Sequence, residues 1–179
     1  MAIKLIALDR DGIVNEDSPS YVKSLSEWRT ISGSTNAIAK LKRHNYKIVI
    51  ATNQSGIARG LFTLDTVNIL HQHMLDEIKR AGGTLDGIFM CPHKPEDNCD
   101  CRKPKPGLLL QAAKKFNIRT QEILMIGDSF RDILAAKNCG AQAMFIKTNQ
   151  KKTSDLLAAQ KEGVPIYESL TEAVDIICS

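Results

Sequence analysis

The architecture of this chain follows from one segment near its start, Ile3-Lys4-Leu5-Ile6-Ala7-Leu8-Asp9-Arg10-Asp11-Gly12. The apolar run at 3–8 predicts a buried strand, and two carboxylates, Asp9 and Asp11, follow at its carboxyl end. In open α/β sheets, ligands bind in the crevice beyond such strand ends. An aspartate there can attack an electrophile, and a second one two positions on points the same way and can transfer protons. Taken alone, an Asp-x-Asp-Gly stretch is equally an ordinary turn.

Short apolar runs alternate with helical patterns along the rest of the sequence. Strands are predicted at 3–8, 46–51, 85–90, 123–126, 143–146 and, for a short one, near Ile166. Helices are predicted at 34–44, 64–81, 108–116, 130–138, between the last two strands, and at 170–177. This alternation is typical of a parallel sheet with right-handed crossovers. We therefore expect an α/β fold, a Rossmann-like three-layer sandwich with a mostly parallel central sheet and no separate cap domain.

Size and composition indicate one globular domain over residues 1–179. The 179 residues are 43% hydrophobic and 25% charged, with a formal net charge of +4. This mild charge suits a phosphorylated small molecule as well as nucleic acid. No apolar run is long enough to span a membrane, and the start lacks the pattern of a signal peptide. We expect a cytoplasmic protein whose five cysteines serve metal binding or core packing rather than disulfides.

Two further predicted strands end in polar residues. After the second comes Thr52-Asn53-Gln54-Ser55-Gly56, which is either a neutral cradle for an oxyanion or a plain polar loop. After the fourth comes Gly127-Asp128-Ser129, with Asp132 one helical turn further on. If the first and fourth strands are neighbours, Asp128 meets Asp9 and Asp11, and these carboxylates repel each other strongly without a cation. Hard oxygen ligands suit Mg²⁺, and the alternative is that Asp128 caps the following helix.

A basic segment, Arg102-Lys103-Pro104-Lys105-Pro106-Gly107, precedes the helix predicted at 108–116. Lys103 can neutralise a phosphoryl group as a point charge, and Arg102 can bind a second oxyanion with its planar guanidinium. The prolines stiffen the segment and reduce the entropy lost when it becomes ordered. The alternative interpretation is a basic surface loop.

Two ligand pairs lie just before this segment, Cys91-Pro92-His93 and Cys99-Asp100-Cys101. Three thiolates and one imidazole at this spacing can close a tetrahedral Cys₃His zinc site. Since four protein ligands leave no open position, the zinc is expected to be structural and to hold the loop 91–101, together with Arg102. Disulfides or buried free thiols are the alternatives, and the reducing compartment disfavours the former.

Together these segments resemble the motifs of a known family. Asp9-Arg10-Asp11-Gly12, Thr52, Lys103 and Gly127-Asp128 are similar to the four motifs of the haloacid dehalogenase superfamily of phosphatases. Within it, the run at 53–60, the zinc loop and Arg102-Lys103-Pro104 resemble the heptose-bisphosphate phosphatases. The histidinol-phosphate phosphatases share the zinc loop and the Arg-Lys-Pro step.

The resemblance implies a role for each motif. Asp9 is the expected nucleophile, which forms an aspartyl-phosphate, and Asp11 is the expected general acid and base. Mg²⁺ is expected on the carboxylates of Asp9 and Asp128 and on the main-chain carbonyl of Asp11. Thr52 and Lys103 are expected to stabilise the transferring phosphoryl group. Arg102 is expected to bind the other phosphate of the substrate.

The same resemblance implies a substrate and its binding residues. These residues are Asp17, Ser18, Tyr21, Thr52, Asn53, Gln54, Ser55, Arg59, Arg102, Lys103 and Ser129. Ser129 stands where the family often carries Lys or Arg. The implied reaction removes one phosphate, that on C7, from D-glycero-D-manno-heptose 1,7-bisphosphate, in the synthesis of ADP-heptose for the lipopolysaccharide core or in a related heptose pathway. The alternatives are a histidinol-phosphate phosphatase, another sugar-phosphate phosphatase and, more distantly, a zinc-stabilised nucleic-acid-binding module. We expect a monomer with a small-molecule substrate and no nucleic-acid or membrane partner.

Overall fold

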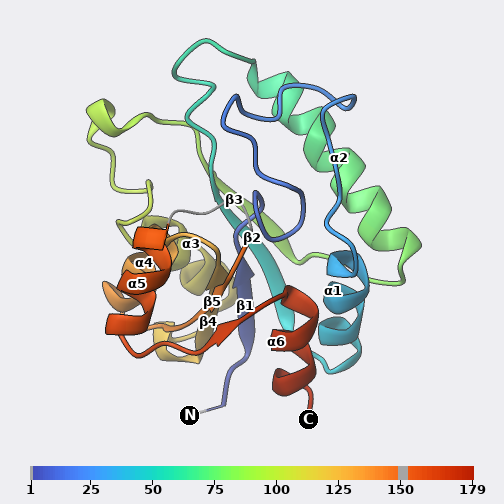
Figure 1. Ribbon diagram of the computed structural model, residues 1–179, viewed down its shortest axis with the longest axis vertical. Coiled ribbons are helices and arrows are strands. Elements are labelled where there is room, and N and C mark those ends of the chain that lie inside the picture. Colours follow the sequence, from blue (N-terminus) through green and yellow to red (C-terminus); the bar gives the residue numbers. More distant parts are fainter. Residues whose placement is uncertain (1, 149–152) are drawn as a thin grey trace.

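The computed structural model describes residues 2–148 and 153–179, and these build a parallel β-sheet between two layers of helices (Figure 1). The strand order is β3-β2-β1-β4-β5-β6, and all neighbouring strands are parallel. The α/β three-layer class predicted from the sequence is confirmed. The strands are β1 (Leu5–Leu8), β2 (Lys47–Asn53), β3 (Gly87–Cys91), β4 (Ile123–Gly127), β5 (Gln142–Ile146) and β6 (Ile166–Tyr167).

In the described residues, helices cover both faces of the sheet (Figure 1). One layer consists of α1 (Ser34–Arg43), α2 (Leu64–Arg80) and α6 (Leu170–Ile177). The other consists of α3 (Gly107–Phe116), α4 (Phe130–Lys137) and α5 (Thr153–Lys161). Short 3₁₀ turns, η1 (Pro95–Asp97) and η2 (Thr120–Glu122), lie in the connections. None of the helices in the described parts of the chain is long and apolar enough to cross a membrane.

The central strands are buried on both faces, as expected of a covered parallel sheet. In β1 the side chains of Ile6 and Leu8 pack into the core beneath α1, α2 and α6. Those of Leu5 and Ala7 pack into the core on the opposite side. This period of two explains why the run at 3–8 is almost continuously apolar rather than alternating with polar residues.

The predicted elements are found with ends within one or two residues of those expected, and the end of β2 is the most informative difference. The strand predicted at 46–51 continues through Thr52 and Asn53, because these residues pair with Met90 and Cys91 of β3. Thr52 and Asn53 are therefore held by the sheet rather than by a loop. Cys91 likewise ends a strand, so the zinc-loop motif starts from a fixed position.

The strand order reverses direction at β1, which lies between β2 and β4. Such a switch point opens a crevice beyond the carboxyl ends of the two strands on either side of the reversal. Asp9 follows β1 directly, and its backbone N–H donates to the carbonyl of Ile126 in β4, at 3.0 Å. The fold thus places Asp9 beside Asp128, which follows β4.

Candidate active site

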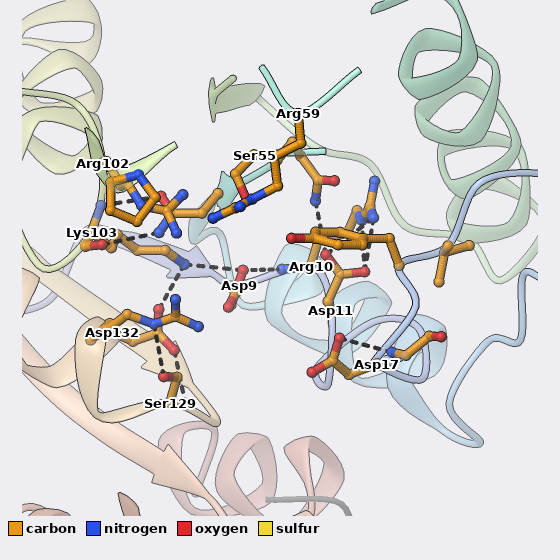
Figure 2. Close-up of a pocket in the computed structure, with 17 residues that line it drawn as sticks. Asp9, Arg10, Asp11, Asp17, Ser55, Arg59, Arg102, Lys103, Ser129 and Asp132 are labelled. Carbon is orange, nitrogen blue, oxygen red and sulfur yellow. Dashed lines mark hydrogen bonds and ion pairs between the residues drawn. The ribbon is translucent and has the colours of Figure 1, made fainter. Parts of the chain in front are cut away.

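A cavity of about 360 Å³ lies at this switch point (Figure 2). It collects side chains from the ends of β1, β2 and β4 and from three loops. The residues predicted from the sequence that line it are Asp9, Asp11, Asp17, Ser18, Tyr21, Asn53, Gln54, Ser55, Arg59, Arg102, Lys103 and Ser129. Thr52 and Asp128 are fully buried beneath it rather than on its wall.

Lys103 lies at the centre of the polar contacts in this cavity. Its ammonium contacts Asp9 Oδ1 at 3.0 Å and Asp132 Oδ1 at 2.6 Å (Figure 2). It also donates to the carbonyl of Ala51 at 2.7 Å. The side chain is only 3% exposed, so these three acceptors replace its water shell. Asn53 fixes the backbone of Lys103 from β2, since its amide donates to the Lys103 carbonyl and accepts from the Lys103 N–H.

Burial and neighbouring charge set the protonation of this pair. Burial raises the pKa of Asp9 to about 6, and the carboxylates of Asp132 and Asp11 add to that effect, whereas Lys103 opposes it. Burial lowers the pKa of Lys103, but the carboxylates of Asp132 and Asp9 outweigh it and raise that pKa above its ordinary value. Lys103 is therefore a permanently charged group, placed where a phosphoryl oxygen would meet Asp9.

Three carboxylates converge beside this lysine. Oxygens of Asp9, Asp128 and Asp132 lie within 4.8 Å of one another. Gly12 and Gly127 make this packing possible, because a Cβ at either position would overlap Asp128 or Asp132, at 1.9 Å and 2.2 Å. With one ammonium among three carboxylates, the group keeps a net negative charge that a divalent cation would neutralise. Hard carboxylate oxygens at this spacing fit Mg²⁺.

Asp11 is not part of that group, although it was expected to converge with Asp9 and Asp128. Its carboxylate accepts from Arg10 Nη2 at 2.8 Å and from Gln54 Nε2 at 2.8 Å (Figure 2). It also accepts from Asn15 Nδ2 at 2.9 Å. Burial raises the pKa of Asp11, but the Arg10 guanidinium and these hydrogen bonds outweigh it, so the pKa lies below its ordinary value. The third carboxylate of the cluster is Asp132 instead.

The sequence left open that Asp128 caps the start of the helix that follows it; in the structure Asp132 takes part in that cap instead. Ser129 is the N-cap residue of α4, and its backbone N–H donates to Asp132 Oδ2 at 3.0 Å. Thr52, expected at the phosphoryl group, accepts from Gln54 Nε2 at 2.9 Å and is fully buried. The second predicted motif therefore reaches the cavity wall through Asn53, Gln54 and Ser55.

The four predicted zinc ligands lie together outside this cavity. Cys91 Sγ lies 3.6 Å from both His93 Nδ1 and Cys99 Sγ, Cys101 Sγ lies 3.3 Å from His93 Nδ1, and the sulfurs of Cys99 and Cys101 are 3.5 Å apart. Zinc–sulfur bonds of about 2.3 Å in a tetrahedron imply ligand separations of about 3.7 Å. The donor set and its spacing therefore fit zinc, and all five cysteines are unpaired.

The zinc loop connects directly to the cavity through Arg102, whose Nη1 donates to the carbonyl of His93 at 3.0 Å. Arg59 and Arg131 line the same cavity. Burial lowers the pKa of Arg102, and the positive charges of Arg131 and Arg59 lower it further, because the three guanidiniums lie near one another. These three guanidiniums thus line the same cavity as Asp9 and Lys103.

Three polar residues of the cavity wall were not predicted as site residues, namely Arg10, Arg131 and Asp132. Asp132 had a usable signal, because it lies one helical turn after Asp128 in the sequence. Arg10 is almost fully buried between two aspartates and contacts Trp28 and His71. Arg131 had no signal, since a charged residue in the first turn of an amphipathic helix is usually solvated.

Comparison with known proteins agrees with this geometry. Residues 100–173 match the HAD-hydrolase-like family. The parallel sheet, the Asp-x-Asp segment at its switch point and this match define a hydrolase of the haloacid dehalogenase type.

Relatives of similar length indicate which phosphatases within this class the chain resembles. The chain is 41% identical over 173 residues to the D-glycero-beta-D-manno-heptose-1,7-bisphosphate 7-phosphatase of Bordetella bronchiseptica, covering 97% of each chain. It is 44% identical over 163 residues to the enzyme of the same name from Pseudomonas putida, covering 91% of this chain and 90% of that one. The chain therefore belongs to the same family as these phosphatases, and it is a phosphoric monoester hydrolase.

A solved structure extends the likeness to the fold. The D,D-heptose 1,7-bisphosphate phosphatase of B. bronchiseptica, in complex with magnesium and phosphate, superposes with a TM-score of 0.90 at 40% identity and 98% coverage of both chains. The corresponding enzyme from Burkholderia thailandensis superposes with a TM-score of 0.73 at 32% identity, covering 98% of this chain and 99% of that one.

Proposed function

We propose that this chain hydrolyses the C7 phosphate of D-glycero-β-D-manno-heptose 1,7-bisphosphate. One observation carries the proposal: the cavity that holds the buried Asp9–Lys103 pair is also lined by three arginines, Arg59, Arg102 and Arg131. With Lys103 assigned to the transferring phosphoryl group, these arginines are available for a second phosphate, which suits a bisphosphate substrate. The relatives that are named for this substrate cover nearly the whole chain.

In the proposed reaction, a carboxylate oxygen of Asp9 attacks the phosphorus, and the bond between phosphorus and the sugar oxygen breaks. Asp11 gives a proton to that oxygen, which releases heptose 1-phosphate. Water then attacks the aspartyl-phosphate, Asp11 takes its proton, and inorganic phosphate leaves with Asp9 restored. Lys103 neutralises charge on the phosphoryl oxygens throughout, and catalysis rests largely on positioning and charge.

Mg²⁺ would be held by the carboxylates of Asp9 and Asp128 and by the main-chain carbonyl of Asp11. When bound, it supplies further charge neutralisation for the transferring phosphoryl group. The proposed set leaves Asp132 to hold Lys103 in place. The magnesium in the related Bordetella structure supports this choice of ion.

The low pKa of Asp11 supports its second role, because an ionised carboxylate is the form that accepts a proton from water. Its first role needs the protonated form. A substrate that brings phosphate charge next to Asp11 raises the pKa of that carboxyl group, because like charges disfavour ionisation. We expect protonation of Asp11 to accompany substrate binding.

The zinc loop supports the substrate end of the site. We propose that zinc on Cys91, His93, Cys99 and Cys101 fixes the His93 carbonyl and thereby orients Arg102 toward the second phosphate. Asp17, Ser18, Tyr21 and Arg59 would contact the sugar, since they line the same cavity as Asp9 and Arg102.

The test is phosphate release from the heptose bisphosphate and from histidinol phosphate, each with and without Mg²⁺. We expect a higher kcat/KM for the bisphosphate, dependence on Mg²⁺, and loss of turnover in Asp9→Asn. The exposed Asp76→Asn on α2 is the matched control and should keep full activity. A preference for histidinol phosphate would overturn the substrate, and turnover in Asp9→Asn would overturn the mechanism.

Three other predictions from the sequence stay predictions: a cytoplasmic location, a monomer, and a single domain over residues 1–179. A role in supplying heptose for lipopolysaccharide or for a related heptose pathway likewise stays a prediction.

A further inference from the structure

Arg131 lies in the first turn of α4 and faces two adjoining cavities. It lines the catalytic cavity together with Arg102, and both also line a smaller cavity of about 270 Å³ beside it. Its Nε donates to Ser129 Oγ at 3.3 Å. Although Arg131 is exposed, its guanidinium is thus tethered at the cavity rather than directed away from it.

Ser129, which accepts the hydrogen bond from Arg131, is in turn held by a residue of another helix. Ser129 Oγ donates to Asp155 Oδ2 of α5 at 3.2 Å, and the same carboxylate oxygen accepts the Phe130 N–H at 3.3 Å. Asp155 therefore holds the start of α4 and the hydroxyl that receives Arg131. Ser129 is itself buried, so its hydroxyl, the shared partner in these contacts, is largely shielded from competing water.

Three guanidiniums meet at this end of the cavity without counter-charges. Arg59 comes from the loop after β2, Arg102 from the zinc loop, and Arg131 from α4. Within residues 2–148 and 153–179, none of the three forms an ion pair with a carboxylate. Like charges placed together cost free energy unless an anion neutralises them. Arginine is the side chain best suited to phosphate, through paired N–H donors.

We propose that Arg131 is a specificity-determining residue that binds the non-reacting phosphate of the substrate jointly with Arg102, held in place by Ser129 and Asp155. The inference rests on the proposed function, because it needs a substrate with two phosphates. Ser129 then has an indirect role in binding, because its hydroxyl positions the guanidinium of Arg131.

The experiment compares kcat/KM for the heptose 1,7-bisphosphate and for heptose 7-phosphate, which lacks the second phosphate. In Arg131→Ala we expect a loss of about 10- to 100-fold on the bisphosphate, mostly through KM, since a charge-assisted contact is removed. The rate on heptose 7-phosphate should stay unchanged. Arg80→Ala, an exposed arginine at the end of α2, removes the same charge away from the site and should change neither substrate.

Two further variants, Ser129→Ala and Arg131→Lys, test how Arg131 is held and how it binds. Ser129→Ala removes the hydrogen bond from Arg131 Nε to Ser129 Oγ but keeps the guanidinium, so it should raise KM for the bisphosphate less than Arg131→Ala does. Lysine keeps the charge but not the planar fork, so Arg131→Lys should fall between wild type and Arg131→Ala.

The outcomes distinguish a failure of the Arg131 inference from a failure of the proposed function. If Arg131→Ala loses nothing, or loses equally on both substrates, the inference is wrong while the proposed function stands. If the wild-type enzyme does not prefer the bisphosphate, the proposed function fails and the inference fails with it. Arg131→Gln gives the same comparison if Arg131→Ala does not fold.

Discussion

Lys103 shows how one buried side chain can serve both stability and chemistry. Its ammonium is the common partner of Asp9 and Asp132, and almost no water reaches it. Removing one partner of a buried ion pair leaves the other charge without compensation. We therefore expect Lys103→Met to lower the free energy of unfolding by about 3–5 kcal/mol, measured by urea denaturation in Mg²⁺-free buffer.

The control for that variant is Lys105→Met in the same segment. Lys105 is 44% exposed and contacts Asp100 at the surface, so its loss should change stability by about 1 kcal/mol or less. Equal effects of the two substitutions would contradict the buried role assigned to Lys103.

His71 is a second buried group with a defined charge state. Its ring lies 3.4 Å from the Arg10 guanidinium, and burial, with the positive charge of Arg10, lowers its pKa from the ordinary 6.5 to about 4. A folded pKa below the unfolded one means that the unfolded chain binds more protons between these values. The neutral His71 thus stabilises the fold fully above pH 6.5, and that contribution is lost as the pH falls toward 4.

NMR titration of the imidazole tests this directly, with His71 expected to titrate near pH 4. In His71→Gln, stability should depend less on pH, with a difference from wild type that changes by about 3 kcal/mol across this window. A His71 that titrates near 6.5 would show that Arg10 is not packed against it as described.

The loop from Cys91 to Cys101 contains one short 3₁₀ turn, η1, and is otherwise irregular beyond the end of β3. Zinc is proposed to order it, and through the His93 carbonyl to orient Arg102. We expect about one zinc per purified chain by metal analysis. Cys99→Ala should release it and raise KM for the bisphosphate more than it lowers kcat.

The matched control is Cys139→Ala, since Cys139 is a free, half-buried thiol at the end of α4. It should keep zinc and KM unchanged. A Cys99→Ala protein with wild-type affinity for substrate would remove the anchoring role of the loop.

The periodicity of apolar residues and the capping residues made most helices and strands predictable from the sequence. The exact residue at which an element ends was predictable in some cases and not in others. Thr63 accepts from the Thr66 N–H and starts α2 as the sequence indicates. Strand β2, in contrast, runs two residues beyond its apolar stretch, because Thr52 and Asn53 are paired by β3. A partner strand that is distant in sequence decides that boundary, so no local pattern could reveal it.

The site as assembled depends on the order of strands, which motifs alone do not specify. The sequence alone places two aspartates, Asp9 and Asp11, at the end of the first strand. Whether Asp11 or Asp132 completes the carboxylate cluster with Asp9 and Asp128 depends on the directions of the side chains. Arg10 turns Asp11 aside through a direct ion pair, and Lys103 draws Asp132 inward. These are tertiary contacts. The sequence therefore indicated which segments meet at the cavity, but only some of the contacts that their side chains make there.

The proposed magnesium joins the ends of β1 and β4, and hence the two halves of the sheet on either side of the switch point. A ligand that binds only the folded state stabilises it, by about 2.7 kcal/mol at a concentration 100 times its Kd. We expect Mg²⁺ to stabilise the wild-type protein in urea denaturation and to have little effect on Asp128→Asn. Asp76→Asn should respond like wild type, and equal stabilisation of Asp128→Asn would contradict the proposed ligand.

The most direct test is acid quenching of the enzyme during turnover of the heptose bisphosphate with Mg²⁺, followed by mass spectrometry of its peptides. The proposed mechanism predicts a phosphoryl group on the peptide that contains Asp9, present during turnover and absent after the substrate is consumed. An enzyme that turns over with Asp9 unmodified, or that carries the phosphoryl group on another residue, would contradict it.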